Sequence, residues 1–412
     1  MSLNTETLPL VNNDTKPLKA GYFSRVFGLF LITLKLGISS FGGPIAHLSY
    51  FRNEYVEKKK YLDEQLYSNV LALAQFLPGP TSSQVGMAVG VLRGGFFGSI
   101  VSFLGFTLPS ALFMTFFAYF SPTVDFKYLH GLKVVAAAIV LHAVSQMAKK
   151  LTPDNKTKTI AGMGAVCALL IESNFVYILV IALGAVIGLF AFRKTCEEEE
   201  SFGKKVDSGI HWTVSILCLV LFLVLLVSTF FVSKFYNHPL VVLFEKLYRS
   251  SALIIGGGHV ILPALESEFV STGLMSLNEF LTGYSLANTV PGPLFTFGTY
   301  IGYVIYGWTG AIVGTISIFL PGFFLLIGTF SIWTRICSNK LLKRSLKGIN
   351  ATVVGILLSA FYKPIFITAI GNSIDFSVAT GLFVMLAVWD LPSILVVVVG
   401  GLVGAVLAFF GI

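Results

Sequence analysis

The chain has 412 residues, of which 55% are hydrophobic and only 12% are charged, and its mean hydropathy is +0.84. Because a soluble domain carries roughly 25% charged residues, this composition excludes a water-exposed globule of this size. The net charge of +8 does not indicate a nucleic-acid partner, since Lys and Arg fall in short loops between apolar runs, where they bias membrane orientation. Four cysteines without C-x-x-C spacing predict neither a disulfide framework nor a metal site. We therefore predict an all-α integral membrane protein.

The chain divides into four predicted regions. Residues 1–21 are expected to be a disordered cytoplasmic N-terminus, 22–192 a first repeat, 193–236 a charged linker with one connecting transmembrane helix, and 237–412 a second repeat. Apolar runs of about 20 residues span a bilayer. In the first repeat such runs occupy 26–40, 66–92, 97–120, 132–147, 159–171 and 175–192.

The second repeat follows the first motif by motif, which predicts duplication. The run 66–92 is interrupted by Pro78, Gly79 and Pro80, and the same triplet recurs at the equivalent place in the second half. Pro291-Gly292-Pro293 corresponds to Pro78-Gly79-Pro80, and Gly256-Gly257-Gly258-His259 corresponds to Gly42-Gly43-Pro44 with His47. Pro321 corresponds to Pro109, and Gly400 and Gly404 correspond to Gly184 and Gly188.

Loop charges predict that the two repeats are inverted. The basic loop 149–158 corresponds to the sparsely charged stretch 362–375, and the basic loop 335–347 corresponds to the nearly uncharged 121–127. Equivalent loops therefore prefer opposite sides under the positive-inside rule. Six crossings per repeat plus the connecting helix give 13, with the N-terminus cytoplasmic and the C-terminus external, in the cell membrane. This arrangement places Lys58, Lys59 and Lys60 outside, against the rule.

The paired Pro-Gly-Pro triplets are the most informative feature. Two prolines flanking a glycine break a helix, and freed backbone groups inside a membrane are tolerated only within protein or beside a wet cavity. Broken helices at equivalent places in inverted repeats indicate a transporter site. The alternative is a purely structural kink.

Residues after the first break indicate an anion. Thr81, Ser82, Ser83 and Gln84 begin a new half-helix, whose free N–H groups and positive dipole end favour negative charge. The same hydroxyls also fit simple helix capping. Because the equivalent segment in the second half is apolar apart from Thr296, we expect an asymmetric site.

Further candidates surround these breaks. The glycine clusters permit close backbone approach to a ligand, and His47 and His259 are candidates to sense protons or contact an anion. Gln75 and Asn288 precede the two triplets by three residues, and Arg93 and Lys35 are the nearest cations. Glycines 86, 90, 94 and 98 predict a small-residue ridge for tight packing.

Several catalytic patterns are absent from the sequence. There is no phosphate-binding loop, no H-E-x-x-H pair and no G-x-S-x-G elbow. We therefore predict neither an enzyme nor ATP-driven transport by this chain, and no cofactor.

Taken together, the motifs resemble the chromate ion transporter family in its long, two-domain form. The resemblance rests on the segment from Phe41-Gly42-Gly43-Pro44 to Leu77-Pro78-Gly79-Pro80-Thr81 and on its second-half counterparts at Gly256 and Pro291. It implies export of chromate, a tetrahedral dianion, across the cell membrane with proton-motive drive, and sulfate as a competitor. Tyr61 and Leu274 stand where the family pattern has tryptophan.

The sequence therefore predicts a secondary transporter of a small oxyanion, with membrane lipid as its other partner. Transport of sulfate or another anion stays open, as does a homodimeric state. An intramembrane enzyme acting on lipid would need the polar cluster of His47, Arg52, Glu54 and Glu57, which an interfacial helix explains better. A non-transporting scaffold leaves the paired helix breaks unexplained.

Overall fold

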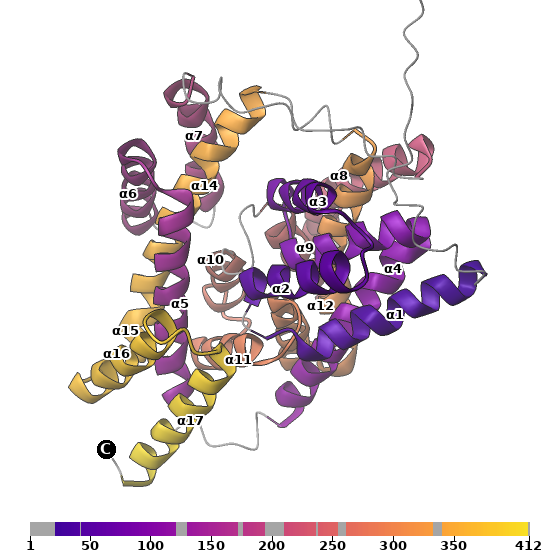
Figure 1. Ribbon diagram of the computed structural model, residues 1–412. Coiled ribbons are helices and arrows are strands. Elements are labelled where there is room, and N and C mark those ends of the chain that lie inside the picture. Colours follow the sequence, from indigo (N-terminus) through magenta and orange to yellow (C-terminus); the bar gives the residue numbers. More distant parts are fainter. Residues whose placement is uncertain are drawn as a thin grey trace, which may run out of the picture.

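The computed structural model describes residues 21–41, 43–120, 130–171, 176–193, 210–235, 238–253, 261–332 and 340–410. Every regular element in these ranges is a helix (Figure 1). Within them, seven helices are long and apolar enough to cross a membrane. The prediction of an α-helical membrane protein is therefore confirmed.

The two halves contain matching series of helices. The first half comprises α1 (Tyr22–Ser39), α2 (Gly43–Arg52), η1 (Asn53–Lys58), α3 (Glu64–Phe76), α4 (Thr81–Phe120), α5 (His130–Leu151), α6 (Asn155–Leu170) and α7 (Val176–Ala191). After α8 (Trp212–Phe235), the second half comprises α9 (Pro239–Leu253), α10 (Ile261–Leu265), η4 (Glu266–Val270), α11 (Leu277–Thr289), η5 (Leu294–Thr296), α12 (Phe297–Phe330), α14 (Lys340–Ala360), η6 (Phe361–Phe366), α15 (Ile367–Ala369), α16 (Ser373–Ala387) and α17 (Ser393–Phe410).

α1 and α2 form a hairpin along α4. A Cβ added to Gly37 would lie 2.7 Å from the backbone oxygen of Phe106, so glycine allows α1 to touch α4 directly. α2 returns along the same part of α4, where the ring of Phe51 meets that of Phe106 at 5.0 Å. The ion pair between Lys35 and Glu54, 3.3 Å apart, joins the two arms.

The Pro-Gly-Pro segment of the first half is a second hairpin. Arg93, near the end of its outgoing arm, lies over the ring of Tyr61, just before the incoming arm α3, at 4.2 Å. α3 has 13 residues, a rise of about 20 Å at 1.5 Å per residue, which is too short to cross a ~30 Å hydrocarbon core. The triplet at residues 78–80 is therefore the tip of a re-entrant hairpin.

α4 itself reverses direction after this hairpin. Gly94 and Gly95 depart from helical geometry, and Gly95 has a φ of 62°. Beyond the turn, Gly98 packs directly on Gly90, and Ser102 Oγ donates to the Gly86 carbonyl at 2.7 Å. The rest of α4 is then free to run the full thickness of the molecule.

Three predictions change as a result. The Pro-Gly-Pro segment is not an interrupted crossing, because its two ends lie side by side. Tyr22, at the start of α1, donates to the Gly94 carbonyl at 2.9 Å, and Arg93 contacts Tyr61, so the stretch Lys58 to Lys60 lies at the end of the molecule where α1 begins. The prediction had placed this stretch on the opposite side of the membrane from the start of α1. The glycine ridge is not continuous either, since it folds on itself around Gly94.

The second half repeats these features. Arg249 of α9 and Glu268 of η4 form an ion pair at 2.9 Å, equivalent to the pair of Lys35 and Glu54. Tyr300 Oη donates to the Glu279 carbonyl at 3.3 Å, which brings the arms of the α11 hairpin together. α12 reverses at Gly307, whose φ is 59°.

α4 and α12 cross antiparallel at the centre of the molecule. Phe96 meets Phe323 at 5.8 Å, and Phe103 meets Phe319 at 5.1 Å, so one helix ascends where the other descends. This is the geometry that inverted repeats produce. The predicted 13 crossings include residues 66–92, which the hairpin geometry does not support as a crossing.

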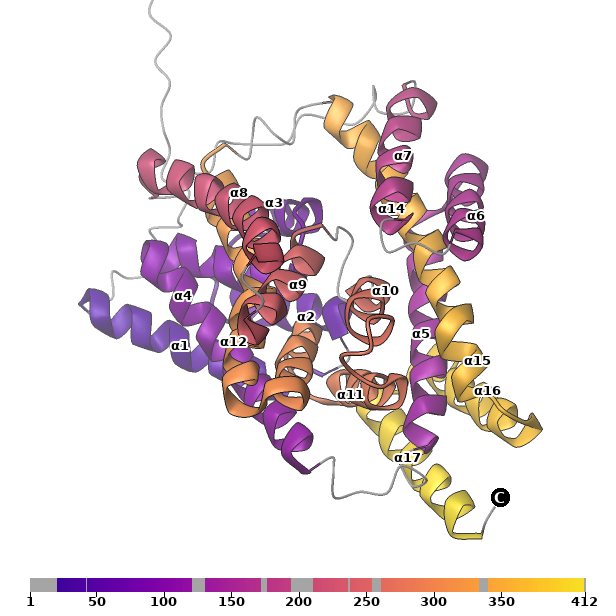
Figure 2. The ribbon, with the colours of Figure 1, turned by 180° about the vertical axis from the view of Figure 1, so that it is seen from behind.

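The halves also exchange their outer helices. α6 and α7 pack on α14, whereas α16 and α17 pack on α5 (Figures 1 and 2). Gly348 fits against Gly184 and Gly188, while Gly131 fits against Gly400 and Gly404. The two Gly-x-x-x-Gly motifs matched in the sequence therefore occupy equivalent places in the structure, each receiving a glycine of the other half.

Candidate functional site

The tip of the first Pro-Gly-Pro hairpin lies against the second half. Gly79 has a φ of 110°, a conformation that strongly favours glycine. A Cβ added there would lie 3.1 Å from the Cα of Gly322 on α12. Gln84 Nε2 donates to the carbonyl of Pro78 at 2.8 Å and to that of Gly322 at 3.3 Å. Gln84 thus ties the tip to the opposite half.

The tip of the second hairpin mirrors this contact. Gly292 has a φ of 102°, and a Cβ there would lie 2.7 Å from Ser110 Oγ on α4. Its N–H donates to the Ser40 carbonyl at 3.0 Å, at the turn between α1 and α2. Ser110 and Gly322 directly follow Pro109 and Pro321. Each tip therefore meets the residue after the proline of the other half's long helix.

Buried polar groups begin α4 beside the first tip. Thr81, Ser82, Ser83 and Gln84 are 8%, 3%, 1% and 0% exposed. Ser83 Oγ and Gln84 Oε1 have no hydrogen-bond partner among the described residues. The first N–H groups of a helix also lack intrahelical acceptors and carry partial positive charge. The Ser83 hydroxyl and these N–H groups are the uncommitted donors that an oxyanion needs, whereas Gln84 Oε1 can only accept.

A second set of uncommitted groups lies around Phe106. The His47 ring is 1% exposed, meets Phe106 edge-on at 5.6 Å and hydrogen-bonds the backbone of Ser40. Its Nδ1 has no partner in the described part of the chain, and neither do Ser40 Oγ and Thr107 Oγ1. None of these tip contacts involves Lys or Arg. The hydroxyls of Ser40 and Thr107 are the neutral donors for an anion here, because the neutral His47 ring already uses its one N–H on Ser40.

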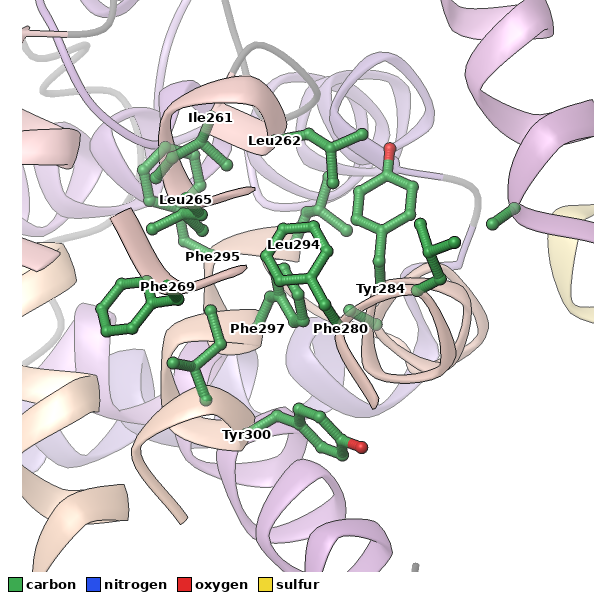
Figure 3. Packing of buried hydrophobic residues seen from close by; sticks show 14 of the residues in the cluster. Ile261, Leu262, Leu265, Phe269, Phe280, Tyr284, Leu294, Phe295, Phe297 and Tyr300 are labelled. Carbon is green, nitrogen blue, oxygen red and sulfur yellow. The ribbon is translucent and has the colours of Figure 1, made fainter. Parts of the chain in front are cut away.

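The residues after the second tip are packed differently. Leu294, Phe295 and Phe297 lie in a hydrophobic cluster with Phe280 and Tyr284 (Figure 3). Thr296 Oγ1 donates to the Pro293 carbonyl at 2.9 Å and is thereby committed to the local backbone. The tips therefore share a backbone plan but differ in polarity.

The remaining candidates fall in several places. Gly43 and Pro44 begin α2. Gln75 is half-buried on α3, and Asn288 Nδ2 donates to the Tyr284 carbonyl of its own helix at 2.8 Å. Gly42, Gly256, Gly257, Gly258 and His259 lie outside the described residues.

Two predicted cations lie away from the tips. Arg93 sits at the far end of the first hairpin, about 18 Å along α4 from its start at 1.5 Å per residue. Lys35 is paired with Glu54 between the arms of the α1–α2 hairpin. The position of Arg93 follows from the hairpin, because the chain reverses at the tip and returns to the end of the molecule where α3 begins.

The sequence analysis overlooked Ser40, Thr107, Ser110 and Gly322. A usable signal was present, since small residues follow both matched prolines. Among the described residues, no group of three His, Cys, Asp or Glu side chains is placed to hold a metal ion.

Comparison with known proteins agrees with this two-fold organisation. The sequence profile of the family described as "Chromate transporter" matches residues 27–189 and again residues 241–405. The chain is 30% identical to an uncharacterized transporter of Methanocaldococcus jannaschii, over 80% of this chain and 82% of that protein. It is 25% identical to a chromate transport protein of Pseudomonas aeruginosa (80% and 78%) and 24% identical to a probable chromate transport protein of Synechococcus elongatus (90% and 93%). No solved structure matches the chain.

The family matches cover most of the chain and both of its halves. Members of this family are membrane transporters rather than enzymes, and the apolar helices agree with a membrane protein. The chain is therefore a multi-pass membrane protein that belongs to the chromate transporter family.

Proposed function

We propose that the chain is a secondary transporter that exports chromate across the cell membrane, driven by the proton-motive force. The observation that carries the proposal is the set of buried, unpartnered polar groups at the start of α4, beside a helix break that is duplicated in the other half. Intramembrane polar groups are costly without a partner, so a polar ligand accounts for them.

The proposed binding site lies between the two hairpin tips. Ser82, Ser83 and the first N–H groups of α4 donate to the oxyanion, and His47 and Thr107 complete the polar lining. The apolar second tip supplies packing and backbone but few donors. Gln84 holds the first tip in place through its two carbonyl contacts. Binding at the tips of opposed hairpins suits alternating access, because each tip rests on the opposite half.

The proposed orientation follows from loop charge. The start of α1, the start of α3 and the end of the first arm of α4 lie on the same side of the molecule as Lys58 to Lys60. We assign this side to the cytoplasm by the positive-inside rule. Sulfate is the second candidate substrate, because it shares the tetrahedral shape and charge of chromate.

The test is flux of radiolabelled chromate into proteoliposomes that contain the purified protein, with and without a proton gradient and with sulfate as competitor. The variant Ser82→Ala/Ser83→Ala removes two donors. Because a hydrogen bond to a charged group contributes about 1.5 to 3 kcal/mol, KM for chromate should rise at least about tenfold.

Thr296→Ala is the matched control, since its hydroxyl is already bound to Pro293 and should leave KM unchanged. Unaltered kinetics in the double variant would refute the proposed anion site. Sulfate flux without chromate flux would retain the site and replace the substrate. Flux that ignores an imposed proton gradient would refute the coupling.

A further inference from the structure

Equivalent helices of the two halves have different surroundings. α11 packs on α5 and α17. Lys133 Nζ of α5 donates to Asn278 Oδ1 of α11 at 3.1 Å, and Ser285 Oγ of α11 donates to the Leu132 carbonyl at 2.5 Å. At the other end of α11, Ser393 Oγ of α17 donates to the Asn288 carbonyl at 2.9 Å. No comparable bond joins the described residues of α3 to α14 or α7.

The register between the two halves is fixed independently. Gly131 of α5 fits against Gly400 and Gly404, and Gly348 of α14 fits against Gly184 and Gly188 in the same way. Gly131 is therefore equivalent to Gly348, so Leu132 and Lys133 correspond to Ile349 and Asn350. The two Pro-Gly-Pro triplets likewise match Asn278 and Ser285 of α11 with Gln65 and Ala72 of α3.

The face of α3 that matches the docked face of α11 is uncovered. Gln65 and Ser68 are exposed and Ala72 is half-buried, whereas Leu281 and Ser285 on α11 are fully buried. This face carries Gln65 and Ser68, whose side chains have hydrogen-bonding groups for a docked helix. On α14, Asn350 Oδ1 is buried without a hydrogen-bond partner among the described residues. Lys133, the equivalent of Asn350 on α5, donates to Asn278, the equivalent of Gln65 on α11.

We propose that α3 docks on α14 in a second conformation, with Gln65 Nε2 donating to Asn350 Oδ1, while α11 separates from α5. The partner of the exposed α3 face is thus a named segment of the same chain. α5 and α14 pack on each other and carry the outer helices of both halves. When this outer group tilts relative to the two hairpins, one contact closes as the other opens.

The consequence is a pair of opposed gates. In the present structure the contact between α11 and α5 is closed, on the side proposed to be external, and the contact between α3 and α14 is open, on the side proposed to be cytoplasmic. The tips at Gly79 and Gly292 lie between the two gates. This inference rests on the chain being a transporter, but not on which anion it carries.

Cysteine cross-linking tests the proposal in a background where the four native cysteines are replaced. The pair Lys133→Cys/Asn278→Cys reports the closed gate, and the pair Gln65→Cys/Asn350→Cys reports the proposed one. Both pairs should cross-link, each should lower transport at least tenfold, and reduction should restore it. Protein already locked at the first pair should not cross-link at the second.

Asn69→Cys/Asn350→Cys is the control, because Asn69 lies on the buried face of α3 and should not cross-link to α14. Recovery of transport on reduction shows that the variants are folded. The proposal fails if both pairs lock in the same molecule, or if the second pair never cross-links in protein that transports an anion. Mutually exclusive cross-links without chromate flux would support the gates and reject chromate as substrate.

Discussion

The two hairpin tips follow one backbone plan and present different chemistry. Each tip places a left-handed glycine against the residue after the proline of the opposite long helix. After the first tip come Ser82 and Ser83, buried and polar; after the second come Leu294 and Phe295, buried and apolar. The two repeats therefore share the backbone contact between each tip and the opposite long helix. They differ in the polarity of the side chains that follow the tip. A ligand between them would meet donors from one half and packing from the other.

The ion pairs of the two halves differ in the same way. Lys35 pairs with Glu54, but its side chain is 63% exposed. Arg249, only 22% exposed, binds both Glu245 and Glu268. The carboxylates are therefore buried in both halves, whereas the cation is mostly exposed in the first half and mostly buried in the second.

Arg249→Ala should produce the largest loss of stability. It leaves Glu245 and Glu268 buried, with Lys246 still paired with Glu268, and breaking a buried pair costs about 3 to 5 kcal/mol. The apparent melting temperature in detergent should fall sharply and little folded protein should be recovered.

Lys35→Ala is the comparison for that variant. Because Lys35 itself is exposed, and because Lys58 remains 4.0 Å from the buried Glu54, the melting temperature should fall less than that of Arg249→Ala. Equal losses in the two variants would show that the two pairs are buried alike.

Gly79→Ala and Gly292→Ala should have the next largest effects. Positive φ costs an alanine about 1 to 2 kcal/mol, and the crowded contacts with Gly322 and Ser110 add about 1 kcal/mol or more. Gly292→Ala should be the more severe of the two, because its new Cβ lies 2.7 Å from Ser110 Oγ and 3.0 Å from Ser110 Cβ, whereas the nearest atom for Gly79→Ala is the Gly322 Cα at 3.1 Å. Chromate flux and thermal unfolding provide the measurements.

Gly95→Ala and Gly307→Ala separate the cost of an unfavourable φ from the cost of a steric clash at a tip. Both glycines have positive φ, but nothing lies within 4 Å of an added Cβ. They should lose only the conformational part, about 1 to 3 kcal/mol, and retain flux, because their φ and ψ values lie in a region that glycine alone readily adopts. If they are as inactive as the tip variants, tip contact is not what matters.

The sequence predicted the duplication, the paired breaks and the asymmetric polarity, because these depend on residue order alone. It did not predict that the broken segment doubles back. A proline pair forces a break but does not set the angle between the two arms, and it is the contact of Arg93 with Tyr61 that brings the arms together. Ser40 and Ser110 were overlooked for the same reason, since contacts between halves follow from how the hairpins dock.

Gln84→Ala should have an intermediate effect. The substitution leaves the carbonyls of Pro78 and Gly322 without their shared donor, and an unsatisfied buried group costs about 1 to 3 kcal/mol. Because the first tip would then move relative to α12, both melting temperature and chromate affinity should fall.

Asn288→Ala is the second-half comparison. Its side chain bonds only the Tyr284 carbonyl of its own helix, so it should lose less stability, about 1 kcal/mol. Should Asn288→Ala weaken chromate binding more than Gln84→Ala does, the second tip would be the principal ligand contact and the proposed asymmetry would be reversed.

Removal of the helix caps should give the smallest losses of stability. The two caps should differ in whether the loss appears in the melting temperature or in local hydrogen exchange. Asp63 caps α3 by accepting from Leu66 N–H at 2.7 Å, and Ser276 caps α11 by accepting from Glu279 N–H at 3.2 Å. Loss of either cap costs about 1 kcal/mol. Because α11 is also held by α5 and α17, Ser276→Ala should lower the melting temperature slightly without faster local opening. α3 lacks that support, so Asp63→Ala should accelerate hydrogen exchange in its first turn. Equal exchange in the two helices would mean that α3 is as firmly docked as α11, and the difference between the halves would then lie in their side chains alone.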